Sequence, residues 1–423
     1  MTKTFFIFFM LTLSFTGINF FGMPLGLATS IPFIAMFSLV IIVKHRNWQK
    51  MKINHTLIFI LPFFILGGIL SAFNAANIAR HILEIFQTIW VLVAITIFMP
   101  SAIRLWPKTT LRALFFGATI NFLIANYDYF FNKNLSSVLN NTTITASGIN
   151  FPIELLERAN FNQRYSGLAD HVNTLGQFSV AIFTLSLGML IHGLTQRKWK
   201  VSLFASIMIV ISLAANIASG SFSGHLALVL ATFILFFGLI LPNISNTGAK
   251  FLTILAATSL LFFLFFYSES GNALSLNNRV LDAYNRVTNT TGPIRQQLTN
   301  EALSLISKNP IMGYGMDPLS QNQIFIKHSV HNIFLLAWVS GGIFSLLGMV
   351  LVYGFYSYFA IKTLLVFRDK AQGWLLISFS TMLIAQMAIN MVQPISFTFI
   401  SWFPIALLIG YWPSPVSESR DGQ

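Results

Sequence analysis

The chain contains no cysteine, which excludes a disulfide framework, a thiolate nucleophile and a thiolate metal site. Charge is also scarce: only 9% of the residues are charged, whereas a soluble domain carries about 25%. The remainder is strongly apolar, with 55% hydrophobic residues and 44 phenylalanines among 423 residues. A water-soluble core could not bury so much apolar surface, so the composition indicates a multi-spanning membrane protein.

Several motifs of nucleotide and hydrolase chemistry are missing as well. No P-loop occurs, which argues against ATP as the energy source. No Asp-x-Asp motif occurs, so a transferase that holds a nucleotide sugar through a metal is not expected. Neither a Gly-x-Ser-x-Gly motif nor a Ser/Lys pair marks a hydrolase. The stretch "SGSFSG" at 219–224 is rich in glycine, but no lysine follows it.

Long apolar runs dominate what is present. They lie near residues 5–21, 24–43, 56–73, 82–99, 112–131, 174–194, 201–218, 225–241, 251–267, 331–364, 373–391 and 396–412. A spanning helix needs about 20 residues, and continuous rather than alternating hydrophobicity favours helices over a barrel. No small-residue cleavage site follows the first run, so we expect an uncleaved span. The sequence predicts an all-α polytopic membrane protein with about twelve transmembrane helices, forming one integral membrane domain over 1–423.

The distribution of positive charge predicts the orientation of these spans. If the N-terminus is cytoplasmic, the inner segments hold 16 of the 25 Lys and Arg residues but only three acids, Asp369, Glu418 and Asp421. The net charge of +13 is therefore a topology signal, and no nucleic-acid partner is expected. Twelve spans with both termini in the cytoplasm fit this distribution.

Two segments on the outer side are too long to be simple connections, namely 132–173 and 268–330. Within the second, "RQQLTNEALSLISKNP" predicts an amphipathic helix that ends before Pro310. Its apolar residues recur at helical spacing: Leu298, Ala302, Leu305 and Ile306. The run 331–364 exceeds one span, and Gly341-Gly342 within it indicates a break or a kink.

Arginines on the outer side are the first candidates for a site, because positive residues are usually scarce there. They are Arg80, Arg158, Arg164, Arg279, Arg286 and Arg295. A guanidinium grips phosphate oxygens in a bidentate manner, so several of them suit a substrate with a diphosphate head and a lipid tail. The alternative is that they form ion pairs with acids on the same side: Glu154, Glu157, Asp170, Asp282 and Glu301.

His331 and Asn332 are the second candidates, because they stand where the polar outer segment meets an apolar run. A neutral imidazole can take a proton from a sugar hydroxyl near pH 7. The alternatives are an interfacial histidine and, for Asn332, a helix cap. His328 lies three residues before His331, but no carboxylate ligand is adjacent, so a metal site is not expected.

Three stretches together resemble the O-antigen ligase and polymerase superfamily. "HN" at 331–332, followed by glycine at 341, is similar to the hallmark of that family. "IRQQLTNEALSLISKNPIMGYGMDPLS" (294–320) and "RYSGLADHVNTLGQ" (164–177) also resemble its motifs, in the expected order. The likeness covers roughly residues 150 to 415.

The resemblance implies a metal-independent glycosyltransferase of the bacterial inner membrane, without a cofactor. Such proteins move a glycan from undecaprenyl diphosphate to an acceptor on the periplasmic side, so the two long outer segments would be periplasmic loops. The partners would be a lipid-linked glycan donor, a lipid A–core or glycan acceptor, and membrane lipids. His331 would be the base and Arg295 the clamp on the diphosphate. Further substrate-binding candidates are Arg279, Arg286, Arg80, Arg164 and Asn332.

The sequence departs from the family pattern near 222 and leaves other functions open. The family often has Ser-Arg where this chain has Ser221-Phe222, and His225 lies close by. A ligase and a polymerase differ only in the acceptor. A lipid or polysaccharide transporter is the alternative from another class, but transporters usually carry ionisable residues in mid-span. A structural membrane scaffold would not need the arginine set.

Overall fold

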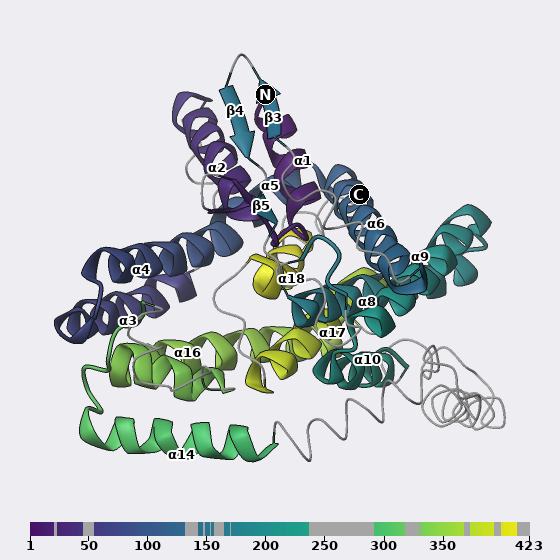
Figure 1. The fold of residues 1–423 in the computed structure, drawn as a ribbon. Coiled ribbons are helices and arrows are strands. Elements are labelled where there is room, and N and C mark those ends of the chain that lie inside the picture. The colour runs from purple at the N-terminus through teal and green to yellow at the C-terminus, as the bar shows by residue number, and fades with distance from the viewer. Residues whose placement is uncertain are drawn as a thin grey trace.

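The computed structural model describes most of the chain, and helices dominate what it describes (Figure 1). The described residues are 1–20, 23–44, 55–131, 143–146, 149–152, 154–155, 165–169, 171–236, 292–317, 330, 332–367, 373–392 and 399–412. The apolar run expected at 251–267 lies outside them.

The first part of the chain forms helices joined by short connections. They are α1 (Thr2–Thr12), α2 (Leu25–Lys44), α3 (His55–Ser71), the 3-10 helix η2 (Ala72–Asn74), α4 (Ile78–Val93), the π-helical turn η3 (Ala94–Phe98), α5 (Met99–Leu105) and α6 (Pro107–Phe131). The helical path runs on from α4 through η3 into α5. The π-helical turn ends two residues before Pro100, which has no N–H to donate to the preceding turn.

The second part supplies the centre of the bundle and the elements around the candidate site. Its helices are α8 (Val172–Thr195), α9 (Trp199–Ser219), α10 (Phe222–Leu235), α14 (Gly292–Lys308), α16 (Ile333–Val366), α17 (Gly373–Val392) and α18 (Phe399–Tyr411). The amphipathic helix expected before Pro310 is confirmed as α14. In Figure 1 it lies alongside α16 at the lower edge of the molecule.

Five helices among the described residues are long and apolar enough to cross a membrane. They are Ile78–Leu105, Val172–Thr195, Trp199–Ser219, Ile333–Val366 and Gly373–Met391. Shorter apolar helices coincide with further predicted runs: Thr2–Thr12, Ala28–Leu39, Phe59–Asn74, Phe222–Leu235 and Phe399–Tyr411. The multi-pass class is therefore confirmed, whereas the count of twelve is not.

The all-α class is confirmed, and a few strands of two to four residues accompany the helices. Residues Ile18–Phe20 form β1, which pairs antiparallel with β2 (Met23–Pro24) and with β5 (Glu154–Leu155). A second antiparallel pair joins β3 (Thr143–Ala146) and β4 (Ile149–Pro152). The segment 132–173 is thus not only a loop, and the first apolar run forms a helix only to Thr12. Apolar composition does not separate a helix from the strand that follows it.

Helix α18 lies at the centre of the bundle and is buried on nearly all sides (Figure 1). The ring of Phe403 in α18 packs on the ring of Phe178 in α8, with the centroids 5.9 Å apart. Trp402 meets Tyr353 of α16 edge to face at 5.8 Å. A helix that is apolar all round, such as α18, is expected to be enclosed in this way.

Buried amides join α8 to α17 beside this centre. The Nε2 of Gln177 donates to Oδ1 of Asn390 at 3.2 Å, and the Nε2 of Gln386 donates to the carbonyl of Gln177 at 2.8 Å. All three side chains are fully buried. Interhelical hydrogen bonds of this kind help to associate helices where lipid supplies no hydrophobic drive.

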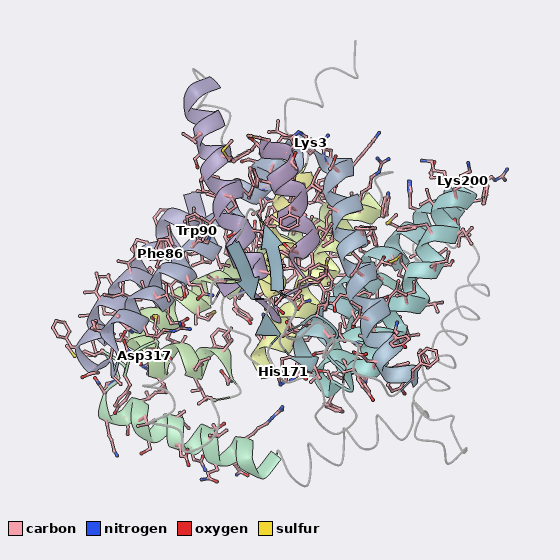
Figure 2. All side chains as sticks on the ribbon, turned by 45° about the horizontal axis from the view of Figure 1, so that its top comes forward. Lys3, Phe86, Trp90, His171, Lys200 and Asp317 are labelled. Carbon is pink, nitrogen blue, oxygen red and sulfur yellow. The ribbon has the colours of Figure 1, made fainter. Side chains whose placement is uncertain are left out.

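The two edges of the molecule differ in the residues they carry. In Figure 2, Lys3 and Lys200 lie at the upper edge, whereas His171 and Asp317 lie well below them. Lys3 belongs to α1 and Lys200 to the start of α9, both in segments that the charge distribution assigns to the cytoplasm. His171 directly precedes α8, and Asp317 ends the stretch that follows α14.

Candidate functional site

A break in α16 organises the candidate site, as Gly341-Gly342 predicts. Gly341 has φ −122° and ψ 17°, and Gly342 has φ 66° and ψ −165°, so neither is helical. The break lies eight residues after α16 begins at Ile333. In a membrane-spanning segment such a break is tolerated only where other groups satisfy the freed backbone.

Residues 309–317, which we call the inserted loop, satisfy the carbonyls of the break. The N–H of Tyr314 donates to the carbonyl of Val339 at 2.8 Å. The N–H of Gly315 donates to the carbonyl of Ser340 at 2.9 Å. An unbroken helix would have filled both carbonyls from its own next turn, so the inserted loop replaces that turn.

The inserted loop also accepts hydrogen bonds from residues of α16 on both sides of the break. The carbonyl of Pro310 accepts from the N–H of Ile343 at 3.0 Å and from the indole Nε1 of Trp338 at 2.9 Å. A Cβ added to Gly342 would lie 1.8 Å from the carbonyl oxygen of Ile311. The two backbones therefore approach so closely that a side chain at Gly342 has no room.

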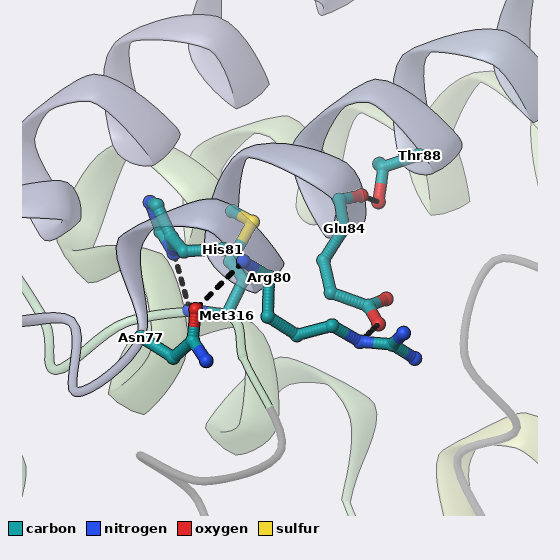
Figure 3. A network of polar contacts seen from close by, with 6 residues as sticks. All are labelled: Asn77, Arg80, His81, Glu84, Thr88 and Met316. Carbon is teal, nitrogen blue, oxygen red and sulfur yellow. Dashed lines mark hydrogen bonds and ion pairs between the residues drawn. The ribbon is translucent and has the colours of Figure 1, made fainter.

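A buried histidine fixes the far end of the inserted loop (Figure 3). The N–H of Met316 donates to Nδ1 of His81 at 2.9 Å, and Nε2 of His81 lies 2.9 Å from the carbonyl of Gly68 in α3. The side chain of His81 is 0% exposed. In this geometry Nδ1 is the acceptor for Met316, and Nε2 is the donor toward the carbonyl of Gly68.

Sequence reasoning missed His81, which lies one residue before the apolar run 82–99. The signal was available, because an ionisable residue at the start of a span is uncommon and is usually paired or functional. What the sequence could not supply was the partner, since Met316 lies 235 positions further along the chain.

Arg80, the neighbour of His81, forms an ion pair and is more than half exposed. Its Nε lies 3.2 Å from Oε1 of Glu84, one turn along α4, and its side chain is 51% exposed. Its backbone N–H donates to Oδ1 of Asn77, which caps the helix (Figure 3). The ion-pair alternative therefore holds for Arg80, with an acid of its own helix as the partner.

Arg295 lies in the first turn of α14, at the other end of that helix from the inserted loop. Its Nε is buried and has no hydrogen-bond partner among the described residues. Glu301, an expected partner for an outer arginine, instead accepts from Nε2 of Gln297 at 2.8 Å. Partial burial lowers the pKa of Arg295 below its ordinary value, because the charge is poorly hydrated. An arginine in this state favours a partner that brings negative charge.

The apolar face of α14 packs against the start of α16. Leu298, Ala302 and Ile306 form one cluster with Val330 and Val339. The carbonyl of Pro310, just after the C-terminal end of α14, bonds to residues on either side of the break in α16. The part of α16 before the break therefore runs parallel to α14. Their N-terminal ends therefore point toward the same side. The helical spacing predicted for α14 is confirmed, and it brings this helix to Val330, the residue before His331.

Asn332 begins α16 as its cap. Its Oδ1 accepts from the N–H of Phe334 at 3.0 Å and from the N–H of Leu335 at 3.1 Å. The cap alternative therefore accounts for the oxygen of this side chain. A role for Asn332 in substrate binding stays a prediction.

Five of the candidate residues named from the sequence lie outside the described part of the chain. They are Arg158, Arg164, Arg279, Arg286 and His331. The residues after Arg164 are described: the N–H of Tyr165 donates to the carbonyl of Ala218 at 3.1 Å. Gly167 has φ 58°, and an added Cβ would lie 2.4 Å from Oδ1 of Asn121. The glycine of the Arg-x-x-Gly stretch is thus required by a close approach to α6.

His225 is directed into the protein and not toward an open surface. Its Nδ1 lies 2.6 Å from Oδ1 of Asn216, whose Nδ2 donates to Oγ of Ser179 at 2.9 Å. The histidine therefore joins α10 to α9 and α8 in a buried network. Ser221 caps α10 through the N–H of Gly224 at 3.2 Å, so "SGSFSG" is a turn between two helices.

The described residues include no group of three His, Asp or Glu side chains arranged to hold a metal ion. They contain three linked features along α14 and α16. A partly buried arginine begins α14, the inserted loop after α14 fills the break in α16, and a buried histidine ties that loop to α3 and α4. The arginine at the start of α14 suits an anionic substrate.

A comparison with known protein families matches a segment that includes elements of the candidate site. The family model described as O-antigen ligase matches residues 207–352, a segment that contains α14, the inserted loop and the break in α16. No curated protein matches the chain. Residues 207–352 of this multi-pass membrane protein are therefore similar to the O-antigen ligase family, which supports a place in the O-antigen ligase superfamily.

Proposed function

We propose that this protein transfers a glycan from undecaprenyl diphosphate to an acceptor hydroxyl on the periplasmic side of the bacterial inner membrane. The observation that carries the proposal is the buried Nε of Arg295, which has no partner in the described part of the chain. A diphosphate offers both the negative charge and the acceptor oxygens that this guanidinium lacks.

The position of α14 beside α16 supports a shared substrate for Arg295 and His331. Both helices point their N-terminal ends to the same side, one end carrying Arg295 and the other following His331. The N-terminal end of a helix is its positive end, so the two dipoles add to the field of the arginine. This field favours an anionic leaving group on that side.

In the proposed reaction, His331 takes the proton of the acceptor hydroxyl. The hydroxyl oxygen then attacks the anomeric carbon of the donor glycan from the face opposite the diphosphate, and the bond from that carbon to the diphosphate oxygen breaks. Undecaprenyl diphosphate leaves, and the anomeric configuration inverts. Arg295, with Arg279 or Arg286, stabilises the charge that develops on the leaving group.

The orientation belongs to the same proposal. With both termini in the cytoplasm, Lys3 and Lys200 face the cytoplasm, and His171 and Asp317 face the periplasm. Their separation in Figure 2 is consistent with this assignment. The lipid tail of the donor then lies among the helices while its diphosphate reaches the periplasmic side.

The acceptor decides between a ligase and a polymerase, and a glycan profile of a deletion strain tests both. A ligase predicts lipid A–core without attached polymer, while the polymer accumulates on its carrier. A polymerase predicts lipid A–core with a single repeat unit. Lipid-linked glycan retained on the cytoplasmic side would contradict the proposal and indicate a transporter.

A further inference from the structure

We infer that His81 is a positioning residue for this site, and that it acts by fixing the inserted loop and, through it, the direction of α14 and of Arg295. The inference rests on the function proposed above. It begins from the two contacts of the imidazole, with Met316 of the loop and with Gly68 of α3, both at 2.9 Å and both inside the protein.

Few side chains can replace this imidazole. The site needs an acceptor toward Met316 and a donor toward Gly68, at the spacing of the two ring nitrogens. Among other residues a glutamine amide comes nearest to this requirement, since it offers one oxygen and one N–H₂ group. The carbonyl of Gly68 also accepts from Oγ of Ser71 at 3.3 Å. An apolar side chain at 81 would therefore mainly remove the acceptor for the N–H of Met316, and the inserted loop would lose its tie to α4.

The inserted loop transmits this restraint to α14 because it follows the helix directly. Asn309 and Asn74 both donate from Nδ2 to the carbonyl of Gly313, at 3.0 and 2.8 Å. The loop is therefore tied at its middle to η2 and at its end to His81. Arg295 lies 13 residues before Lys308, about 20 Å along the axis. A small change of direction at the loop would displace its guanidinium noticeably.

The absence of cysteine allows a direct test with a single spin label. Leu303 is on the exposed side of α14, so Leu303→Cys can carry the label without entering the apolar cluster. The label would be compared in otherwise native protein, in His81→Leu and in His81→Gln, all in lipid nanodiscs. We expect a restricted label in the native protein and in His81→Gln, and a mobile one in His81→Leu.

Binding of inorganic pyrophosphate gives the second readout, by calorimetry on the same samples. We expect the Kd to rise about 10-fold in His81→Leu and less than 3-fold in His81→Gln, as for any weakened charge-assisted contact. A loss of folded protein alone would lower the number of sites and leave the Kd unchanged. If His81→Leu does not reach the membrane, His81→Asn, which can keep only one of the two contacts, replaces it.

The two readouts separate the inference from the function on which it rests. A label equally restricted in all variants overturns the inference, and so does a mobile label with an unchanged Kd. If native protein binds no pyrophosphate, the proposed function fails, and the label alone then decides whether His81 anchors α14.

Discussion

Gly342 of α16 and Ile311 of the inserted loop approach so closely that a Cβ on the glycine would lie 1.8 Å from the carbonyl oxygen of Ile311. The glycine also has φ 66°, which other residues adopt with strain. We therefore expect Gly342→Ala to destabilise the protein by on the order of 2–4 kcal/mol, measured as a lower Tm in detergent. Gly354→Ala is the control, since nothing lies within 4 Å of its added Cβ. Equal Tm values for the two variants would contradict the described break.

Arg295 is expected to be sensitive to substitution by lysine as well as by alanine. A lysine keeps the charge but loses the fork of donors, so both variants should lower glycan transfer by about 10²-fold. The measurement is transfer from undecaprenyl-diphosphate-linked glycan in membranes with matched protein levels. Lys308→Ala, at the other end of α14, should leave transfer within about 2-fold of native protein. An active Arg295→Lys variant would argue against a bidentate contact with phosphate.

Replacement of His331 by alanine should remove the proposed base. Loss of a general base lowers rates by about 10²–10⁴-fold, and the amount of protein in the membrane should stay unchanged. The control is His192→Phe, which keeps a ring against Trp374, where native His192 stacks at a centroid distance of 4.7 Å. Full transfer by His331→Ala would exclude this residue from the chemistry.

Asn332 allows its capping role to be separated from a role in binding. Aspartate can cap a helix as well as asparagine, so Asn332→Asp should keep both the Tm and the rate of transfer. Asn332→Ala should lower stability by about 1 kcal/mol. If Asn332→Asp were stable but inactive, the amide N–H₂ of Asn332 would be needed for the substrate.

Metal independence is tested by chelation. Purified protein given a lipid-linked glycan should transfer at the same rate before and after treatment with EDTA, since in the proposed mechanism arginine neutralises the leaving group. A rate that falls with EDTA and returns with one added divalent cation would require a metal in the mechanism.

Local patterns predicted part of this architecture well. The spacing of Leu298, Ala302 and Ile306 predicted α14, and Gly341-Gly342 predicted the break in α16. Both features depend on residues that are close together in the chain. Helical periodicity and the conformational freedom of glycine are readable at that range.

Long-range contacts were beyond the reach of the sequence. Nothing near Val339 indicates that Tyr314 will supply its hydrogen bond, and nothing near His81 indicates Met316. The first apolar run also ended earlier than predicted, because Ile18 pairs with Leu155 in a sheet. For Arg295, the residue type suggested an anion site, but only the structure revealed a buried Nε with no partner among the described residues.

The inserted loop is synthesised before the helix that it completes. When the later segment enters the bilayer, its residues around Gly341 can satisfy their backbone only as a straight helix, unless the loop has already docked. Bending would then follow docking of the loop: an undocked segment would be straight, and the bent form requires the inserted loop in place. The angle of α16 at Gly342 would thus indicate whether the inserted loop has docked.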